Sequence, residues 1–190
     1  MKAVLLDGSL NGEPGASHVR GLVTGELEAR GWEVQPFTLR ELEIRPCIGC
    51  FGCWVQTPGQ CLMDDAAREI APAVINSDLV IYLTPVTFGG YSSELKKALD
   101  RNICLILPFF TKIGGEIHHK PRYDRYPRLL GLGLLPEADA ESERIFKTLV
   151  GRNALNMHAP AHAVGVILGC QPTDEMRAEI QTLLGAVEVK

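Results

Sequence analysis

Four cysteines fall within fifteen residues of the sequence, and their spacing limits the chemistry that they could perform. In the stretch CIGCFGCWVQTPGQC, Cys47, Cys50 and Cys53 have C-x2-C-x2-C spacing, and Cys61 follows after a Pro-Gly turn. Three thiolates on one loop can face a common centre, and the fourth can close the site after the turn. Clustered cysteine spacing of this kind is typical of iron–sulfur ligation. The stretch therefore indicates an iron–sulfur site as the first hypothesis.

Three other interpretations of the same thiols stay open on spacing alone. Zinc prefers two well-separated cysteine pairs that close a tetrahedron, so a third cysteine this near the first two fits zinc less well. A C-x-x-C pair can also form a redox disulfide, with the remaining thiols as resolving partners. Finally, the cysteines could be packed thiols in a hydrophobic loop beside Phe51 and Trp54.

The bulk composition indicates an ordinary globular protein. The 190 residues are 46% hydrophobic and 22% charged, with a net charge of -4, and we expect one domain over residues 1–190. The acidic balance argues against a nucleic-acid partner. The N-terminus does not resemble a signal peptide, and no apolar run reaches membrane-spanning length. We therefore expect a cytoplasmic protein, and in a reducing compartment clustered cysteines more often bind metal or transfer electrons than form structural disulfides.

Five short apolar runs predict the strands of a buried parallel sheet, because they are rich in Val, Ile and Leu and mostly lack alternation. They span residues 2–7, 32–37, 78–84, 128–135 and 161–169. Amphipathic segments between them predict helices, the first capped by Ser17, the second starting near Asp64 and Asp65, and the third capped by Ser92 or Ser93. Alternation of this kind predicts a doubly wound, three-layer α/β fold with strand order 2-1-3-4-5.

Two long segments, residues 38–63 and 109–127, are predicted to be irregular insertions in this domain. The first carries the cysteines, and its position after the second strand should place them on the ligand-binding rim of the sheet. The second is basic and aromatic. Its His118, His119 and Arg122 could meet a substrate or the phosphate of a nicotinamide cofactor, but a solvated loop or a subunit contact is the simpler interpretation.

Two further loops should meet where neighbouring crossovers go to opposite faces of the sheet, the usual ligand site of such folds. The loop Asp7–Ser17 is rich in small and hydroxyl residues and leads into a helix N-terminus, which suits a phosphate. In the segment Thr84–Arg101, Phe88 and Tyr91 bracket two glycines that would let the backbone approach a planar ring.

The segments TPVTFGGYSSELKKALDR and CIGCFGCW…PGQCLMDD resemble, respectively, the flavin-ring loop of flavodoxin-like NADPH-dependent FMN reductases and the cysteine motif of their iron–sulfur flavoprotein branch. The resemblance covers residues 2 to about 110. It implies that the FMN phosphate is held by Ser9, Asn11 and Ser17. It implies that the isoalloxazine is lined by Pro85, Val86, Thr87, Phe88, Gly89 and Gly90. It also implies that a [4Fe–4S] cluster is bound by Cys47, Cys50, Cys53 and Cys61.

The resemblance further implies an FMN-dependent oxidoreductase that passes electrons between a nicotinamide or protein donor and an acceptor, and that works as a homo-oligomer, a dimer or a tetramer. NAD(P)H is the expected co-substrate. Phosphate loops of the family often contain Ser-Pro-Arg, whereas SLNGEPG lacks the arginine, so backbone amides and hydroxyls are expected to bind the phosphate. A cluster-free NAD(P)H-dependent FMN or quinone reductase, a non-enzymatic electron carrier and a zinc-binding domain stay open as alternatives.

Overall fold

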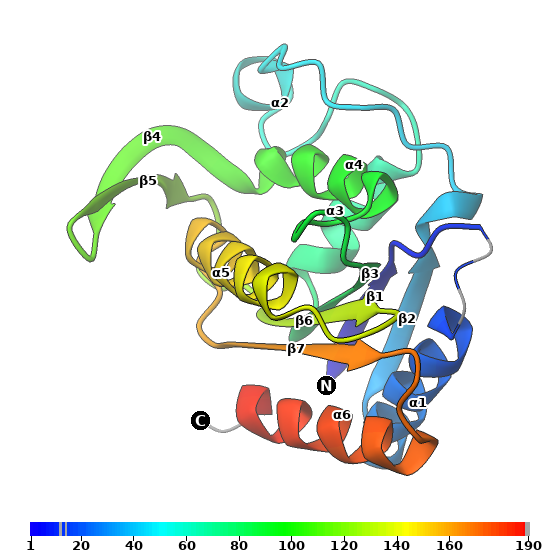
Figure 1. The fold of residues 1–190 in the computed structure, drawn as a ribbon. Helices are drawn as coiled ribbons and strands as arrows, with labels where there is room; N and C mark the ends of the chain where they lie inside the picture. The colour runs from blue at the N-terminus through cyan, green and yellow to red at the C-terminus, as the bar shows by residue number, and fades with distance from the viewer. Residues whose placement is uncertain (12, 14, 189–190) are drawn as a thin grey trace.

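A five-stranded parallel sheet forms the centre of the computed structural model, which describes residues 1–11, 13 and 15–188 (Figure 1). The strand order is β2-β1-β3-β6-β7, and every pairing in the sheet is parallel. This confirms the predicted order, with β6 and β7 as the fourth and fifth strands. The strands are β1 (Lys2–Asp7), β2 (Glu33–Thr38), β3 (Leu79–Pro85), β6 (Arg128–Leu135) and β7 (His162–Leu168).

Helices cover both faces of the sheet, which is why its central strands are apolar along their whole length (Figure 1). One face packs against α1 (Ala16–Ala29) and α6 (Thr173–Glu188). The other packs against α3 (Ala67–Ile75), α4 (Ser93–Arg101) and α5 (Ala140–Asn156). The short elements are the 3-10 turns η1 (Leu39–Glu41) and η2 (Asn102–Leu105) and the helical turn α2 (Gly52–Val55). Among the described residues, no helix combines the length and apolarity needed to cross a membrane.

The helix starts agree with the sequence expectations in part. Ser92 caps α4, since its hydroxyl accepts a hydrogen bond from the amide of Leu95 at 3.2 Å. The prediction that Ser17 caps the first helix is wrong. Gly15 precedes α1 in a left-handed conformation with φ 80°, and Ser17 lies exposed in the first turn. Pro72 lies inside α3, which continues through it to Ile75.

The segment from 109 to 127 is not an irregular loop, and that prediction is wrong. It contributes to an antiparallel hairpin of β4 (Ile106–Ile113) and β5 (Glu116–Pro121), a two-stranded sheet separate from the main one. The turn uses two consecutive glycines, Gly114 and Gly115, both with positive φ. In Figure 1 the hairpin, in light green, projects from the body of the fold beside α5. Residues 122–127 then lead into β6.

Candidate functional site

Two arginines from different elements flank the loop that follows β1. Asp7, which ends β1 and is only 1% exposed, accepts a hydrogen bond from Arg20 of α1 at 3.0 Å. Arg40 of η1 lies 3.7 Å from the same carboxylate and donates a 2.7 Å hydrogen bond to the hydroxyl of Ser9. Ser9 is buried and also donates to Asp7 at 2.5 Å. Two guanidinium groups thus face the buried carboxylate of Asp7, and Arg40 also pairs with the exposed Glu41 at 3.3 Å.

Arg40 is a cation at this loop that the expectation of backbone amides and hydroxyls did not include. Arg40 follows β2 instead of β1, so no motif within the loop could reveal it. The sequence did offer one indirect signal for Arg40. Strands one and two were predicted to be neighbours, and residues that follow the ends of neighbouring parallel strands lie close together. Asn11 and Ser17, the other two predicted phosphate residues, are exposed at the same loop and the start of α1.

The predicted ring loop after β3 forms a tight four-residue turn. Thr87 and Gly90 exchange backbone hydrogen bonds of 3.0 and 2.8 Å. Phe88 and Gly89 between them both have positive φ, 50° and 74°. A left-handed conformation is uncommon for a bulky side chain and suggests a functional position. The Phe88 side chain is 98% exposed, so burial in this chain does not explain its conformation.

The two loops are tied together by buried polar contacts. Ser92 donates a 2.5 Å hydrogen bond to the carbonyl of Gly8, and its amide donates to the hydroxyl of Thr84 at 2.9 Å. The amide of Gly8 in turn donates to the carbonyl of Leu83 at 2.8 Å. The structure therefore brings the predicted phosphate and ring residues to one rim of the sheet. Two arginines and a buried serine hydroxyl next to an aromatic turn fit a phosphorylated ring cofactor such as FMN.

The four cysteines line one cavity of ≈ 20 Å³, together with Arg101 and several apolar residues. Cys53 is buried, whereas Cys47 and Cys61 are half-buried and Cys50 is exposed. Burial, followed by the charges of the three other thiols, raises the pKa of Cys53. The thiols are thus close enough to repel one another as thiolates, a repulsion that a bound metal centre would relieve.

Aromatic contacts position the cysteine segment on the fold. Phe51 begins α2 in a left-handed conformation with φ 56° and stacks on Trp54 at a ring distance of 5.1 Å. The indole nitrogen of Trp54 donates to the carbonyls of Ile103 and Ile106 at 3.1 and 3.0 Å. The cysteine segment is therefore anchored to η2 and to the start of β4.

The donor set of this cavity fits an iron–sulfur cluster, although the side chains are not arranged around one. Within the described part of the chain, no three His, Cys, Asp or Glu side chains are positioned to hold a metal ion. A void of ≈ 20 Å³ accommodates about one water molecule. The four thiols line the same void, and Ile48, Cys50 and Phe51 beside it are exposed. Loading a cluster would therefore require this exposed segment to move outward.

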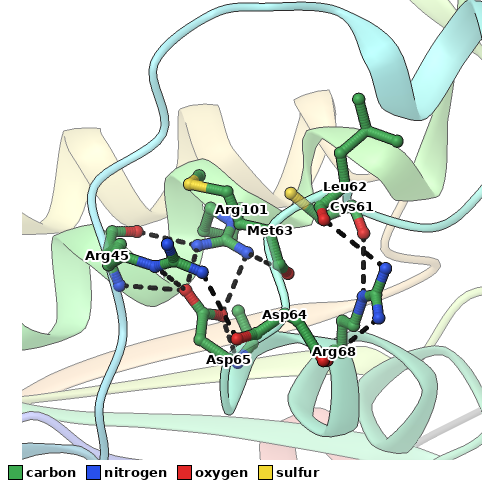
Figure 2. Close-up of polar contacts among 9 residues, drawn as sticks. Arg45, Cys61, Leu62, Met63, Asp64, Asp65, Arg68 and Arg101 are labelled. Atoms are coloured by element: carbon green, nitrogen blue, oxygen red, sulfur yellow. Dashed lines mark hydrogen bonds and ion pairs between the residues drawn. The ribbon is translucent and has the colours of Figure 1, made fainter.

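A buried ion pair includes Arg101, which lines the cavity; Figure 2 shows the contacts of this pair. Arg101, the last residue of α4, and Asp65 have side chains that are each 1% exposed, and their hydrogen bonds measure 2.8 and 3.0 Å. Burial alone would raise the pKa of Asp65. The hydrogen bonds from Arg101 and from the amides of Arg45 and Ala67 outweigh it, so the pKa is lowered.

The cysteine cavity and the loop after β1 contact opposite ends of α4. The cysteine segment leaves β2 at the expected rim but crosses above α4, and α2 lies over that helix in Figure 1. Ser92, at the start of α4, contacts the phosphate loop, whereas Arg101, at its end, lines the thiol cavity. A nine-residue helix is about 13 Å long, so α4 separates the two sites within one chain.

His118, His119 and Arg122 make contacts within and beneath the β4–β5 hairpin. His118 is buried and hydrogen bonds to Asn156 at 2.9 Å and to Glu116 at 3.1 Å. His119 contacts the carbonyl of Leu107 at 2.7 Å. Arg122 donates to the carbonyl of Cys104 at 2.9 Å. The interpretation as a merely solvated loop is therefore wrong for His118, and all three side chains hold the hairpin in place.

The sequence profile of the NADPH-dependent FMN reductase family matches residues 1–121. The chain belongs to this family. The matched range includes both loops of the rim and all four clustered cysteines. Membership of an FMN reductase family agrees with the arrangement of these two loops, which suits a phosphorylated ring cofactor.

Relatives with similar sequences include iron–sulfur flavoproteins. One from Methanocaldococcus jannaschii is 31% identical over 62% of this chain and 61% of its own length. One from Archaeoglobus fulgidus is 33% identical over 53% of this chain and 45% of its own length. The chain thus matches less than two thirds of each of these relatives.

Solved structures confirm the flavodoxin-like fold over the whole chain. The NAD(P)H:quinone oxidoreductase from Methanothermobacter marburgensis has a TM-score of 0.72 at 12% identity, covering 100% of this chain and 96% of that one. An FMN-dependent NADH-azoreductase from Bacillus anthracis, in complex with FMN, has a TM-score of 0.57 at 12% identity, covering 98% and 97%. At these identities the likeness concerns the fold.

Proposed function

We propose that this protein is an FMN-dependent oxidoreductase that passes electrons between a nicotinamide or protein donor and an acceptor through FMN and a [4Fe–4S] cluster. The observation that carries the proposal is that four thiols line one cavity, in a chain whose two FMN-family loops form a single rim. The names of its relatives in Methanocaldococcus and Archaeoglobus support the cluster.

In the proposed site, the loop after β1 binds the FMN phosphate, with Ser9, Asn11 and Ser17 near it and Arg40 as the added cation. Arg40 currently donates to Ser9 and faces Asp7, so it is held at the loop before any phosphate binds. Preorganisation of this kind lowers the cost of binding. Arg20 compensates the charge of Asp7, which keeps that buried carboxylate from repelling the phosphate.

The turn after β3 would hold the isoalloxazine, with Pro85 and Val86 behind it and Thr87–Gly90 at its edge. Bound FMN would supply an acceptor for a hydride and a donor of single electrons. The chain's part is to present the ring beside an open surface on which a nicotinamide can stack, with Phe88 as an exposed aromatic neighbour. Hydride transfer between rings held face to face needs no general base, and positioning accounts for the rate.

The four cysteines would hold the cluster, but within one chain they lie across α4 from the rim. A second copy of the chain could bring its cysteines closer to this rim, so we propose a homo-oligomer. The β4–β5 hairpin is the proposed contact, because it projects from the fold and exposes Phe109, Phe110 and Ile117. Large exposed apolar side chains grouped on one element are typical of subunit interfaces.

The test is to purify the protein without oxygen, assay iron, acid-labile sulfide and flavin on one sample, and record its visible spectrum. Stoichiometric flavin with four irons per chain is the expected result. Flavin and NAD(P)H turnover without iron would instead support a cluster-free FMN or quinone reductase, which the small size of the thiol cavity favours as the second candidate. Stoichiometric zinc without flavin would overturn the proposal altogether.

A further inference from the structure

Arg101 has five N–H donors, and the protein satisfies only four of them. Its terminal Nη1 donates to Asp65 and to the carbonyl of Arg45, each at 2.8 Å. Its Nη2 donates to Asp65 at 3.0 Å and to the carbonyl of Met63 at 3.3 Å. The remaining donor, Nε–H, is buried and has no partner among the described residues. A buried unpaired donor is costly, so its presence suggests a partner that these side chains do not provide.

The surroundings of Arg101 indicate where a hydrogen-bond acceptor for its Nε–H would lie. The side chain lines the thiol cavity together with all four cysteines. Burial would lower the pKa of Arg101, but contacts with Asp65 and then Cys61 outweigh it and raise the pKa. Independently of charge, Arg101 and Cys61 are neighbours because both line this small cavity. Figure 2 shows both residues beside the turn that carries Met63.

We propose that Arg101 is the cation that tunes the thiol-bound cluster, with its Nε–H donating to sulfur and its fixed charge favouring the reduced state. This inference rests on the cluster proposed at the four cysteines. Each electron that enters such a cluster, from reduced FMN or from a chemical reductant, adds one negative charge to the cavity. A cation held there, and a hydrogen bond to sulfur, both raise the reduction potential.

Asp65 has the role of holding this cation in place without taking its Nε–H. The carboxylate pairs with the terminal nitrogens and is fixed by the amides of Arg45 and Ala67, both at 3.1 Å. Arg45 provides a matched control, since it also pairs with Asp65, at 3.5 Å, but its side chain is half exposed and does not line the cavity. The substitutions R101Q and R45Q therefore remove the same charge from the same network in two different places.

The experiment is a redox titration of the iron-loaded protein, followed by the electron paramagnetic resonance signal of the reduced cluster. Reduction of R101Q should be disfavoured about tenfold, which for a one-electron couple is about 59 mV. R101K, which keeps the charge but lacks the Nε–H, should give an intermediate shift in the same direction. R45Q should stay near the wild-type potential, and FMN content should be unchanged in all three.

Other outcomes separate this inference from the proposed function. Wild-type protein that never takes up iron would contradict the cluster and the role of Arg101 together. A loaded R101Q protein with wild-type potential would contradict the role of Arg101 alone. If R101Q and R101K both lose iron, the melting temperatures of these iron-free variants are compared with that of the iron-free wild type to separate a direct role of Arg101 from a structural one. An unchanged value supports a direct role of Arg101 at the cluster, and a lowered value makes Arg101 merely structural and overturns the inference.

Discussion

Ser92 donates its hydroxyl hydrogen bond to the carbonyl of Gly8, a residue 84 positions earlier in the chain. The contact is buried and 2.5 Å long, and the same hydroxyl accepts the amide hydrogen of Leu95 as the cap of α4. One serine therefore starts the helix and joins the two loops of the rim. A disturbance at this contact should affect the helix start and cofactor binding together.

Gly8→Ala should separate the two loops. An added Cβ would lie 2.6 Å from the Cβ of Leu95 and 2.9 Å from the hydroxyl of Ser92, so backbone must shift. We expect FMN affinity to fall at least about tenfold, or about 1.4 kcal/mol, measured by quenching of flavin fluorescence. Gly25→Ala in α1, where nothing lies within 4 Å of the new Cβ, is the control. It should leave FMN affinity unchanged and raise stability slightly.

Arg40→Gln should weaken FMN much more than riboflavin, because only FMN carries the phosphate. Hydrogen bonds to charged groups contribute about 1.5–3 kcal/mol, so a loss of roughly 10- to 150-fold in FMN affinity is expected. Titration calorimetry with both flavins measures the difference. Arg144→Gln is the control for charge removal, because the side chain of Arg144 in α5 is exposed. Equal losses for FMN and riboflavin in R40Q would show that Arg40 does not bind the phosphate.

Phe88→Gly should relieve backbone strain while impairing turnover. Phe88 has φ 50° and is almost fully exposed, so a glycine keeps the turn and removes a left-handed penalty of about 1–2 kcal/mol. We expect an unchanged or higher melting temperature and a higher KM for NAD(P)H or the acceptor. Gly89→Ala provides the contrast, since its Cβ would lie 2.6 Å from Ile145 and should lower the melting temperature. Unaltered steady-state kinetics in F88G would count against a role in binding.

Serine in place of any of Cys47, Cys50, Cys53 or Cys61 should remove most of the bound iron and leave flavin bound. Cys104→Ser is the matched control, because Cys104 is also buried near these thiols but does not line their cavity. Burial, followed by the charges of Cys53 and Cys61, raises the pKa of Cys104 to about 12, so it stays protonated near neutral pH. Loss of iron from C104S equal to that from C53S would contradict this ligand set.

Acid should destabilise the wild type more than Asp78→Asn. The amide of Lys2 and Arg125 donate to Asp78 at 2.8 and 3.1 Å, and these contacts, opposed by partial burial, lower its pKa below the ordinary 3.8. A lowered folded-state pKa means that the stabilisation is complete above that ordinary value and is lost as pH falls through the folded-state pKa. The difference in urea unfolding free energy between wild type and D78N should therefore be constant near neutral pH and shrink as the pH is lowered below 3.8. A difference that stays constant over this range would contradict the assignment.

The sheet was predictable because its central strands, such as β3 and β6, are buried on both faces and therefore appear in the sequence as unbroken apolar runs. Their order followed from the alternation of strands and helices. The β4–β5 hairpin was missed because it lies outside the main sheet, and His118 and Arg122 made its sequence resemble a solvated loop. The pair Gly114-Gly115 was the one available hairpin signal.

The candidate site was predictable only where it is local in sequence. The turn at Phe88 and the cap at Ser92 follow from residues that are neighbours in the chain. The charge at the phosphate loop depends instead on Arg40, which reaches Ser9 from 31 residues away, and spacing cannot show such a contact. The same holds for Arg101, which meets Asp65 across 36 residues.

The helix α4 has one end in each proposed cofactor site, with Ser92 at the flavin rim and Arg101 at the thiol cavity. A packed helix moves as a unit, so a displacement imposed at one end is felt at the other. If filling the thiol cavity changes FMN affinity by some factor, thermodynamic reciprocity requires FMN to change retention of the cluster by the same factor. If that factor favours joint occupancy, protein saturated with FMN would retain its iron longer than flavin-free protein, while a chain without iron would still bind FMN with lower affinity.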